Sequence, residues 1–114
     1  MALTIWHNTR CSKSRQALTL LKERGFEPTV RLYLKDTPSI EEIADVLAML
    51  GLSAIKMMRT GEPEFKASGL SKDSEENELI AAMAQTPKLI ERAIVINGSK
   101  AALGRPPESI LKIL

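Results

Sequence analysis

The sequence predicts one α/β domain built on a mixed β-sheet, in the order βαβ, helical insertion, ββα. Three observations carry this prediction: β-favouring runs near both ends of the chain, helical periodicity between them, and an Asn-Gly turn inside a late apolar run. The chain has 114 residues, of which 44% are hydrophobic and 26% charged, which suits a soluble domain with one core.

The first third of the chain carries the βαβ pattern. Residues 2–6 (ALTIW) form a β-favouring run, and residues 11–25 carry apolar side chains at helical spacing and end in a glycine. Within residues 28–34 (PTVRLYL), the apolar residues Val30, Leu32 and Leu34 alternate with polar or amphipathic ones. This alternation predicts a second strand, and a helix between two strands predicts that the strands pair in parallel.

The middle of the chain, at about 39–90, is predicted to be a helical insertion. Residues 39–42 (SIEE) form a capping box that opens a helix, and this helix is expected to end before Gly51. Two further helical stretches are predicted, a short one near 53–59 and a longer one from about 74 to 84.

The last third of the chain predicts a hairpin and a helix. Residues 93–103 (AIVINGSKAAL) place an Asn-Gly turn between two apolar runs, which is a strong hairpin signal. Pro107 can start a final helix, because proline is favoured at the first helical position. No repeat, low-complexity tract or flexible linker divides the chain, so we expect a single domain over residues 1–114.

Charge and cysteine content limit the classes of partner. The net charge of +2 is too small to indicate nucleic-acid binding, and no window approaches the roughly 18 consecutive apolar residues of a membrane span. One cysteine cannot form an internal disulfide, and the N-terminal sequence lacks the basic region of a signal peptide. We expect a cytoplasmic, monomeric protein that binds neither nucleic acid nor membranes.

The only cysteine, Cys11, lies in the polar stretch WHNTRCSKSR. The predicted elements place it at a helix N-terminus, where unpaired N–H groups and the helix dipole favour an anion such as a thiolate. The helix terminus stabilises a thiolate by up to about 2 kcal/mol, which is too little to keep Cys11 ionised at neutral pH. A second positive group is therefore needed, and His7 and Arg10 are the nearest candidates in sequence. Ser12 and Ser14 add hydroxyl donors that could hold an oxyanion beside the sulfur.

Other interpretations of this stretch differ in weight. Cys11 could be an inert buried residue, but its neighbours are polar. His7 could equally be a strand-end histidine satisfied by the backbone. We expect no metal site, because one cysteine and one histidine leave a zinc site short of ligands. A phosphatase-type loop is excluded, because Ala17 stands where that loop needs an arginine.

Four segments resemble the glutaredoxin-coupled arsenate reductases, the ArsC family, and most of all its short bacterial branch. These segments are HNTRCSKSR (7–15), MMR (57–59), PKLIERAIVING (87–98) and GRPPE (104–108). The resemblance spans essentially the whole chain. It implies a thioredoxin-like core with a helical insertion, which agrees with the order of elements predicted above.

The resemblance also implies a chemistry. Cys11 would attack arsenate to form a thiol-linked ester, and three arginines would surround the oxyanion, at Arg59, Arg92 and Arg105. Guanidinium groups suit this role, because they stay charged and bind tetrahedral oxyanions through two hydrogen bonds. Three other arginines lack this context and are predicted to be surface residues, namely Arg15, Arg24 and Arg31.

One position departs from the family pattern. The family usually has a proline after the arginine that corresponds to Arg92, and that proline is preceded by a cis peptide bond, whereas this chain has Ala93. Because a cis bond before a residue other than proline costs about 2.5–4 kcal/mol, we expect a trans bond or a strained site with weakened oxyanion binding.

The single cysteine requires an external reductant. The resemblance implies glutathione as co-substrate and glutaredoxin as partner, with no tightly bound cofactor. The Spx-like regulators, which bind RNA polymerase, offer an alternative with the same fold. Their Cys-x-x-Cys switch is absent here because Ser14 takes the second position. A thiol oxidoreductase acting on another substrate is a third possibility.

Overall fold

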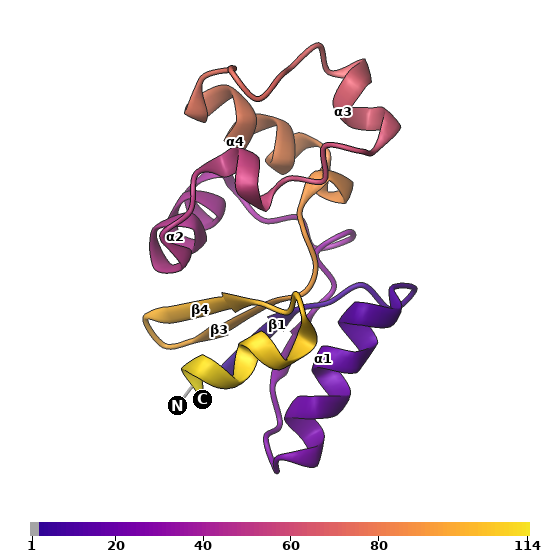
Figure 1. The fold of residues 1–114 in the computed structure, drawn as a ribbon, viewed down its shortest axis with the longest axis vertical. Helices are drawn as coiled ribbons and strands as arrows, with labels where there is room; N and C mark the ends of the chain where they lie inside the picture. Colours follow the sequence, from indigo (N-terminus) through magenta and orange to yellow (C-terminus); the bar gives the residue numbers. More distant parts are fainter. Residues whose placement is uncertain (1–2) are drawn as a thin grey trace. The chain divides into compact units, whose positions relative to one another are not determined.

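A computed structural model describes residues 3–114 of the protein (Figure 1). The helices and strands follow in the order β1 (Leu3–Trp6), α1 (Ser12–Glu23), β2 (Thr29–Arg31), α2 (Ile40–Leu50), α3 (Pro63–Ala67), α4 (Glu76–Gln85), β3 (Ile94–Asn97) and β4 (Lys100–Leu103). Residues 3–114 also contain three 3-10 helices, at Ala54–Met57, Pro87–Leu89 and Pro107–Ile113. The predicted order of βαβ, helical insertion and ββα is confirmed, although Ala2 of the expected first strand lies outside the described residues.

The chain forms two compact units, which we describe separately. The first comprises Met1–Asp36, described from residue 3 onward, together with Arg92–Leu114, and it contains the whole sheet. The second comprises Thr37–Glu91 and contains α2, α3 and α4. The insertion expected at about 39–90 falls within this second unit.

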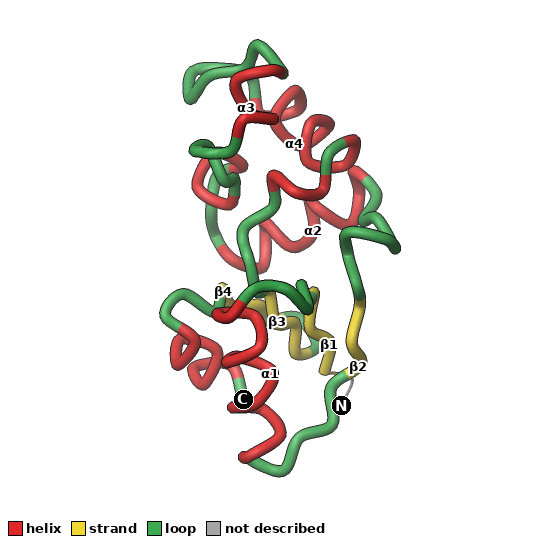
Figure 2. Tube along the Cα trace, turned by 90° about the vertical axis from the view of Figure 1, so that its right-hand side faces the viewer, coloured by secondary structure: helices red, strands yellow, loops and turns green. Residues whose placement is uncertain are grey.

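The sheet of the first unit has the strand order β2-β1-β3-β4 (Figure 2). β1 pairs in parallel with β2 and antiparallel with β3, and β3 pairs antiparallel with β4. Leu3 and Ile5 of β1, which share a face because they are two residues apart, pack with Val95 of β3 and with residues of α1 and the last 3-10 helix. The buried members of this core are Leu3, Ile5, Ala17, Leu21, Ala93, Val95 and Ile110.

The predicted second strand is too long. β2 covers only Thr29–Arg31, and the chain then turns, because the Leu32 carbonyl accepts hydrogen bonds from two N–H groups three and four residues later. The alternating apolar residues are exposed, by 42%, 38% and 41% for Val30, Leu32 and Leu34, whereas Tyr33 is buried. β2 is an edge strand, so an alternating pattern there does not require that its apolar face is covered.

The predicted capping box of α2 is confirmed. The Ser39 hydroxyl accepts from the Glu42 N–H at 3.1 Å, and the Ser39 N–H donates to the Glu42 carboxylate at 3.0 Å. The helix ends at Gly51, whose φ of 68° is left-handed and favours glycine.

The other predicted helices exist with altered bounds or type. The stretch expected near 53–59 is a 3-10 helix over Ala54–Met57, and the stretch expected over 74–84 is α4. The last helix starts at Pro107, as predicted, but it is a 3-10 helix. α3 was not predicted. Within residues 3–114, no helix combines the length and apolarity that crossing a membrane requires.

Candidate active site

The sheet register brings three of the predicted site residues to one end of the sheet. The last residue of β1 pairs with the first residue of β3, which in turn pairs with the last residue of β4. The loop that leads to Cys11 follows β1, Arg92 lies two residues before β3, and Arg105 lies two residues after β4. These segments are far apart in the sequence but leave the sheet at the same end.

Cys11 is the N-cap residue of α1, the position predicted from the sequence. Its backbone is extended, with φ −97° and ψ 123°, and its side chain makes no capping hydrogen bond. Its N–H donates to the Asn8 carbonyl at 3.1 Å, and its carbonyl accepts from the Arg15 N–H at 3.0 Å. The backbone around Cys11 is therefore fixed by hydrogen bonds, while the sulfur caps no backbone group at the N-terminus of α1.

A hydrogen-bonded pair, Ser14 and His7, fastens the loop to the first turn of α1. Ser14 is fully buried, and its hydroxyl accepts from the Asn8 N–H at 3.0 Å and lies 2.6 Å from Nδ1 of His7. A buried hydroxyl needs an acceptor for its own proton, so Ser14 donates to Nδ1. His7 then carries its proton on Nε2.

The surroundings of His7 favour its neutral form. Burial lowers the pKa of His7 below its usual value of 6.5, and the positive charges of Arg15 and Lys22 lower it further. The sequence predicts that His7 provides positive charge for a thiolate. The surroundings of the His7 ring instead disfavour that positive charge. The imidazole instead positions the loop through Ser14.

Two arginines near the loop show how it is built. The Arg10 N–H donates to the Asn8 side-chain oxygen at 3.0 Å, an Asx turn that shapes the residues just before Cys11. Arg15 is exposed, as predicted, but its Nη1 donates to the Thr9 carbonyl at 2.8 Å. Sequence reasoning missed this contact, which joins residues six positions apart across the start of α1. Ser12 is exposed on the first turn.

Arg31 is not the surface residue predicted from the sequence. Its side chain is only 17% exposed and lies over the Trp6 ring, 5.6 Å from the ring centre. Its Nε also contacts the carbonyl and the carboxylate of Asp36, at 3.1 and 3.3 Å. Because the Arg31 carbonyl accepts from the His7 N–H at 2.8 Å, the end of β2 is joined to the start of the Cys11 loop.

The peptide bond between Arg92 and Ala93 is cis, and so is the bond between Arg105 and Pro106. Of the two alternatives expected before Ala93, the trans bond is wrong. The Ala93 carbonyl accepts from the Gly104 N–H at 2.7 Å, which joins the segment that carries Arg92 to the segment that carries Arg105.

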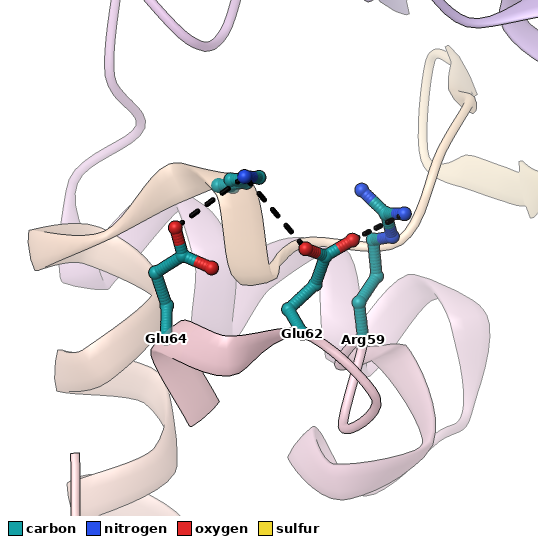
Figure 3. Close-up of polar contacts among 4 residues, drawn as sticks. Arg59, Glu62 and Glu64 are labelled. Atoms are coloured by element: carbon teal, nitrogen blue, oxygen red, sulfur yellow. Dashed lines mark hydrogen bonds and ion pairs between the residues drawn. The ribbon is translucent and has the colours of Figure 1, made fainter. Parts of the chain in front are cut away.

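Arg59 lies in the second unit, within a network of charges (Figure 3). Its guanidinium forms an ion pair with Glu62, and Lys88 contacts both Glu62, at 3.7 Å, and Glu64, at 3.4 Å. The Arg59 N–H donates to the Leu89 carbonyl at 2.7 Å. Arg59 is therefore held in place and paired with a carboxylate.

Known proteins resemble this chain over its whole length. The "Arsenate reductase" of Haemophilus influenzae is 43% identical over 116 residues, covering 100% of both chains. The "Uncharacterized protein YfgD" of Escherichia coli is 48% identical over 112 residues, covering 96% of this chain and 94% of that protein.

A solved structure and a family match complete the comparison. The "Arsenate reductase from Vibrio cholerae" has a TM-score of 0.96 and 45% identity, covering 100% of this chain and 98% of that chain. This likeness confirms the thioredoxin-like fold that the resemblance implied. Because residues 6–113 match the ArsC family, the chain belongs to that family.

Proposed function

We propose that this protein reduces arsenate to arsenite, with Cys11 as the nucleophile. Full-length relatives that carry the name arsenate reductase support the reaction. The observation that carries the proposal is the position of Cys11, whose sulfur caps no backbone group at a helix N-terminus, at the sheet end that also carries Arg92 and Arg105.

The chemistry starts with the Cys11 thiolate. The sulfur attacks arsenic, and a bond forms between the Cys11 sulfur and arsenic. An arsenic-bound oxygen leaves as water after protonation. A glutathione thiolate then attacks the Cys11 sulfur. The electron pair of the sulfur–arsenic bond passes to arsenic, which yields arsenite and a mixed disulfide between Cys11 and glutathione. Glutaredoxin attacks the glutathione sulfur and releases Cys11, so two thiols supply the two electrons.

The arginines bind the oxyanion in this proposal. Arg59, Arg92 and Arg105 would neutralise the charge of arsenate, because a guanidinium remains protonated at any working pH. Arg10 and Ser12, next to Cys11 in sequence, add donors to the loop. His7 and Ser14 position the loop before Cys11, because their hydrogen bonds join it to the first turn of α1.

The test is arsenate-dependent oxidation of NADPH, coupled through glutathione reductase, for the native protein beside Cys11→Ser. With glutathione and glutaredoxin present, we expect turnover by the native protein and none by the variant. Leaving out glutaredoxin should slow turnover, because the mixed disulfide then accumulates. A folded protein with a reactive Cys11 and no arsenate-dependent turnover would contradict the proposal. It would favour a thiol oxidoreductase with another substrate.

The alternative of a polymerase-binding regulator has a separate test. Ser14, which replaces the second cysteine of the regulators' switch, is buried and hydrogen-bonded to His7 and Asn8. It serves the structure of the loop and cannot form a disulfide. Stoichiometric capture of the RNA polymerase α-subunit would nevertheless favour the regulator.

A further inference from the structure

The Cys11 loop forms one wall of a pocket in the first unit. Residues 7–10 line one side of the pocket, and Leu32, Leu34 and Lys35, from the turn after β2, line the other. The pocket has a volume of about 260 Å³, which suits a small molecule or part of one. The hydrogen bond from the His7 N–H to the Arg31 carbonyl joins the two walls at their base.

The pocket is lined by the residues that directly precede Cys11, which is itself buried and is not among the lining residues. Arg10, which lines it, precedes Cys11 in the chain, and the Asn8 carbonyl, from the same wall, accepts the Cys11 N–H at 3.1 Å. A group held in this pocket therefore lies beside the loop that leads to Cys11.

The chemistry of the lining favours an anion with apolar portions. Arg10 and Lys35 are cations, and none of the described residues that line the pocket is acidic. Leu32 and Leu34 add apolar surface and are 38% and 41% exposed. These two leucines are among the exposed apolar residues that the edge strand and its turn leave uncovered.

A second groove near Cys11 has the opposite charge balance. It runs between α1 and the last 3-10 helix, starts at Ser12, and has a volume of about 530 Å³. One cation, Arg15, and two carboxylates, Glu23 and Glu108, line it. Although it is larger, its charge disfavours an anionic ligand.

We propose that the pocket between the Cys11 loop and the turn after β2 binds glutathione, the thiol donor of the proposed reaction. This inference rests on the proposed function. Glutathione carries two carboxylates and one ammonium at neutral pH, so it has one net negative charge. Its carboxylates match Arg10 and Lys35, and its methylene groups match the two leucines. The same contacts would hold the glutathione part of the mixed disulfide while glutaredoxin attacks it.

The experiment measures disulfide exchange and needs no arsenate. The Cys11 thiolate attacks one sulfur of oxidised glutathione, the disulfide bond breaks, and a glutathione thiolate leaves as Cys11 becomes glutathionylated. The rate is followed by mass spectrometry in about 0.15 M salt, where charges separated by more than about 8 Å are largely screened. The same rate with the neutral hydroxyethyl disulfide reports the intrinsic reactivity of Cys11.

Two lysine variants distinguish the pocket from general attraction. Lys35→Gln should lower the rate with oxidised glutathione about two- to fivefold, the size expected for one solvent-exposed charge contact, and should leave the rate with hydroxyethyl disulfide unchanged. Lys13→Gln is the matched control, because Lys13 is exposed and two residues from Cys11 but does not line the pocket. The ratio of the two rates should change much less for this variant.

An unchanged ratio in Lys35→Gln would overturn the inference, and so would an equal fall of the ratio in Lys13→Gln. Arsenate plays no part in this measurement. A failed arsenate assay together with a Lys35-dependent preference for glutathione would therefore remove the proposed substrate and support the glutathione site.

Discussion

Ser14 and His7 show how two residues of the candidate site act through the structure rather than through the substrate. Ser14 is fully buried and bonds to both the Asn8 N–H and the His7 ring, so it couples the loop before Cys11 to the helix after it. The sequence predicts correctly where Cys11 stands, because the strand, loop and helix that fix its position have local signals. The charge state of His7 could not be predicted, because burial and the nearness of Arg15 and Lys22 arise only in the folded chain.

The stability of the protein is expected to depend on His7 at mildly acidic pH. Because the folded state lowers the pKa of His7 below 6.5, the unfolded state binds a proton more readily there. The contribution of His7 to the free energy of unfolding is therefore fully present above about pH 6.5 and is lost as the pH falls through the lowered pKa. His7→Asn retains an acceptor for Ser14 and does not titrate.

Urea denaturation at pH 7.5 and at pH 5.5 measures this effect. The native protein should lose more unfolding free energy between the two pH values than His7→Asn does, because most carboxylates titrate below this window. Equal losses in the two proteins would show that His7 titrates in the folded state as it does in the unfolded chain.

At the level of elements, local sequence signals predicted the ends of a helix well. They did not predict which strand lies at the edge of the sheet. α2 begins and ends where its capping box and glycine indicate, because both signals act within a few residues. β2 was predicted too long, since alternation says nothing about whether a strand is at the edge of the sheet. α3 was missed because its five residues are too few to show helical periodicity.

The capping box of α2 offers a test at this scale. Ser39→Ala removes the acceptor for the Glu42 N–H, and we expect it to lower the free energy of unfolding by about 1 kcal/mol. Ser53→Ala is the control, because Ser53 precedes a 3-10 helix but makes no side-chain capping hydrogen bond. Denaturation of both variants by urea provides the comparison. A loss in the control as large as that in Ser39→Ala would mean that the capping bond is not the cause.

Across the whole molecule, the sheet places the Cys11 loop, Arg92 and Arg105 at one end, although more than 80 residues separate the first two in sequence. The predicted hairpin and parallel pair imply part of this arrangement. They do not specify that β1 pairs with β3, which is the contact that brings Cys11 and Arg92 to the same end. The family resemblance, rather than any local pattern, identified these arginines.

The last prediction concerns Arg59 and its carboxylate partner in the second unit. Arg59 is proposed to bind arsenate, yet its guanidinium is paired with Glu62, whose side chain is only 17% exposed. A carboxylate so close to an oxyanion ligand competes for the guanidinium and repels the substrate. Glu62→Gln keeps the size of the side chain and removes its charge. We therefore expect the KM for arsenate to fall about two- to fivefold with little change in kcat, the effect of one partly screened charge.

Steady-state kinetics in the coupled arsenate assay test this, with Glu64→Gln as the control. Glu64 contacts the same lysine, Lys88, but is not paired with Arg59 (Figure 3), so its variant should leave KM unchanged. A higher KM in Glu62→Gln would mean that Glu62 orients Arg59 for the substrate instead of competing with it. An equal fall of KM in both variants would point to the general loss of negative charge around Lys88. Only a fall confined to Glu62→Gln identifies Arg59 as the group that the carboxylate withholds from arsenate.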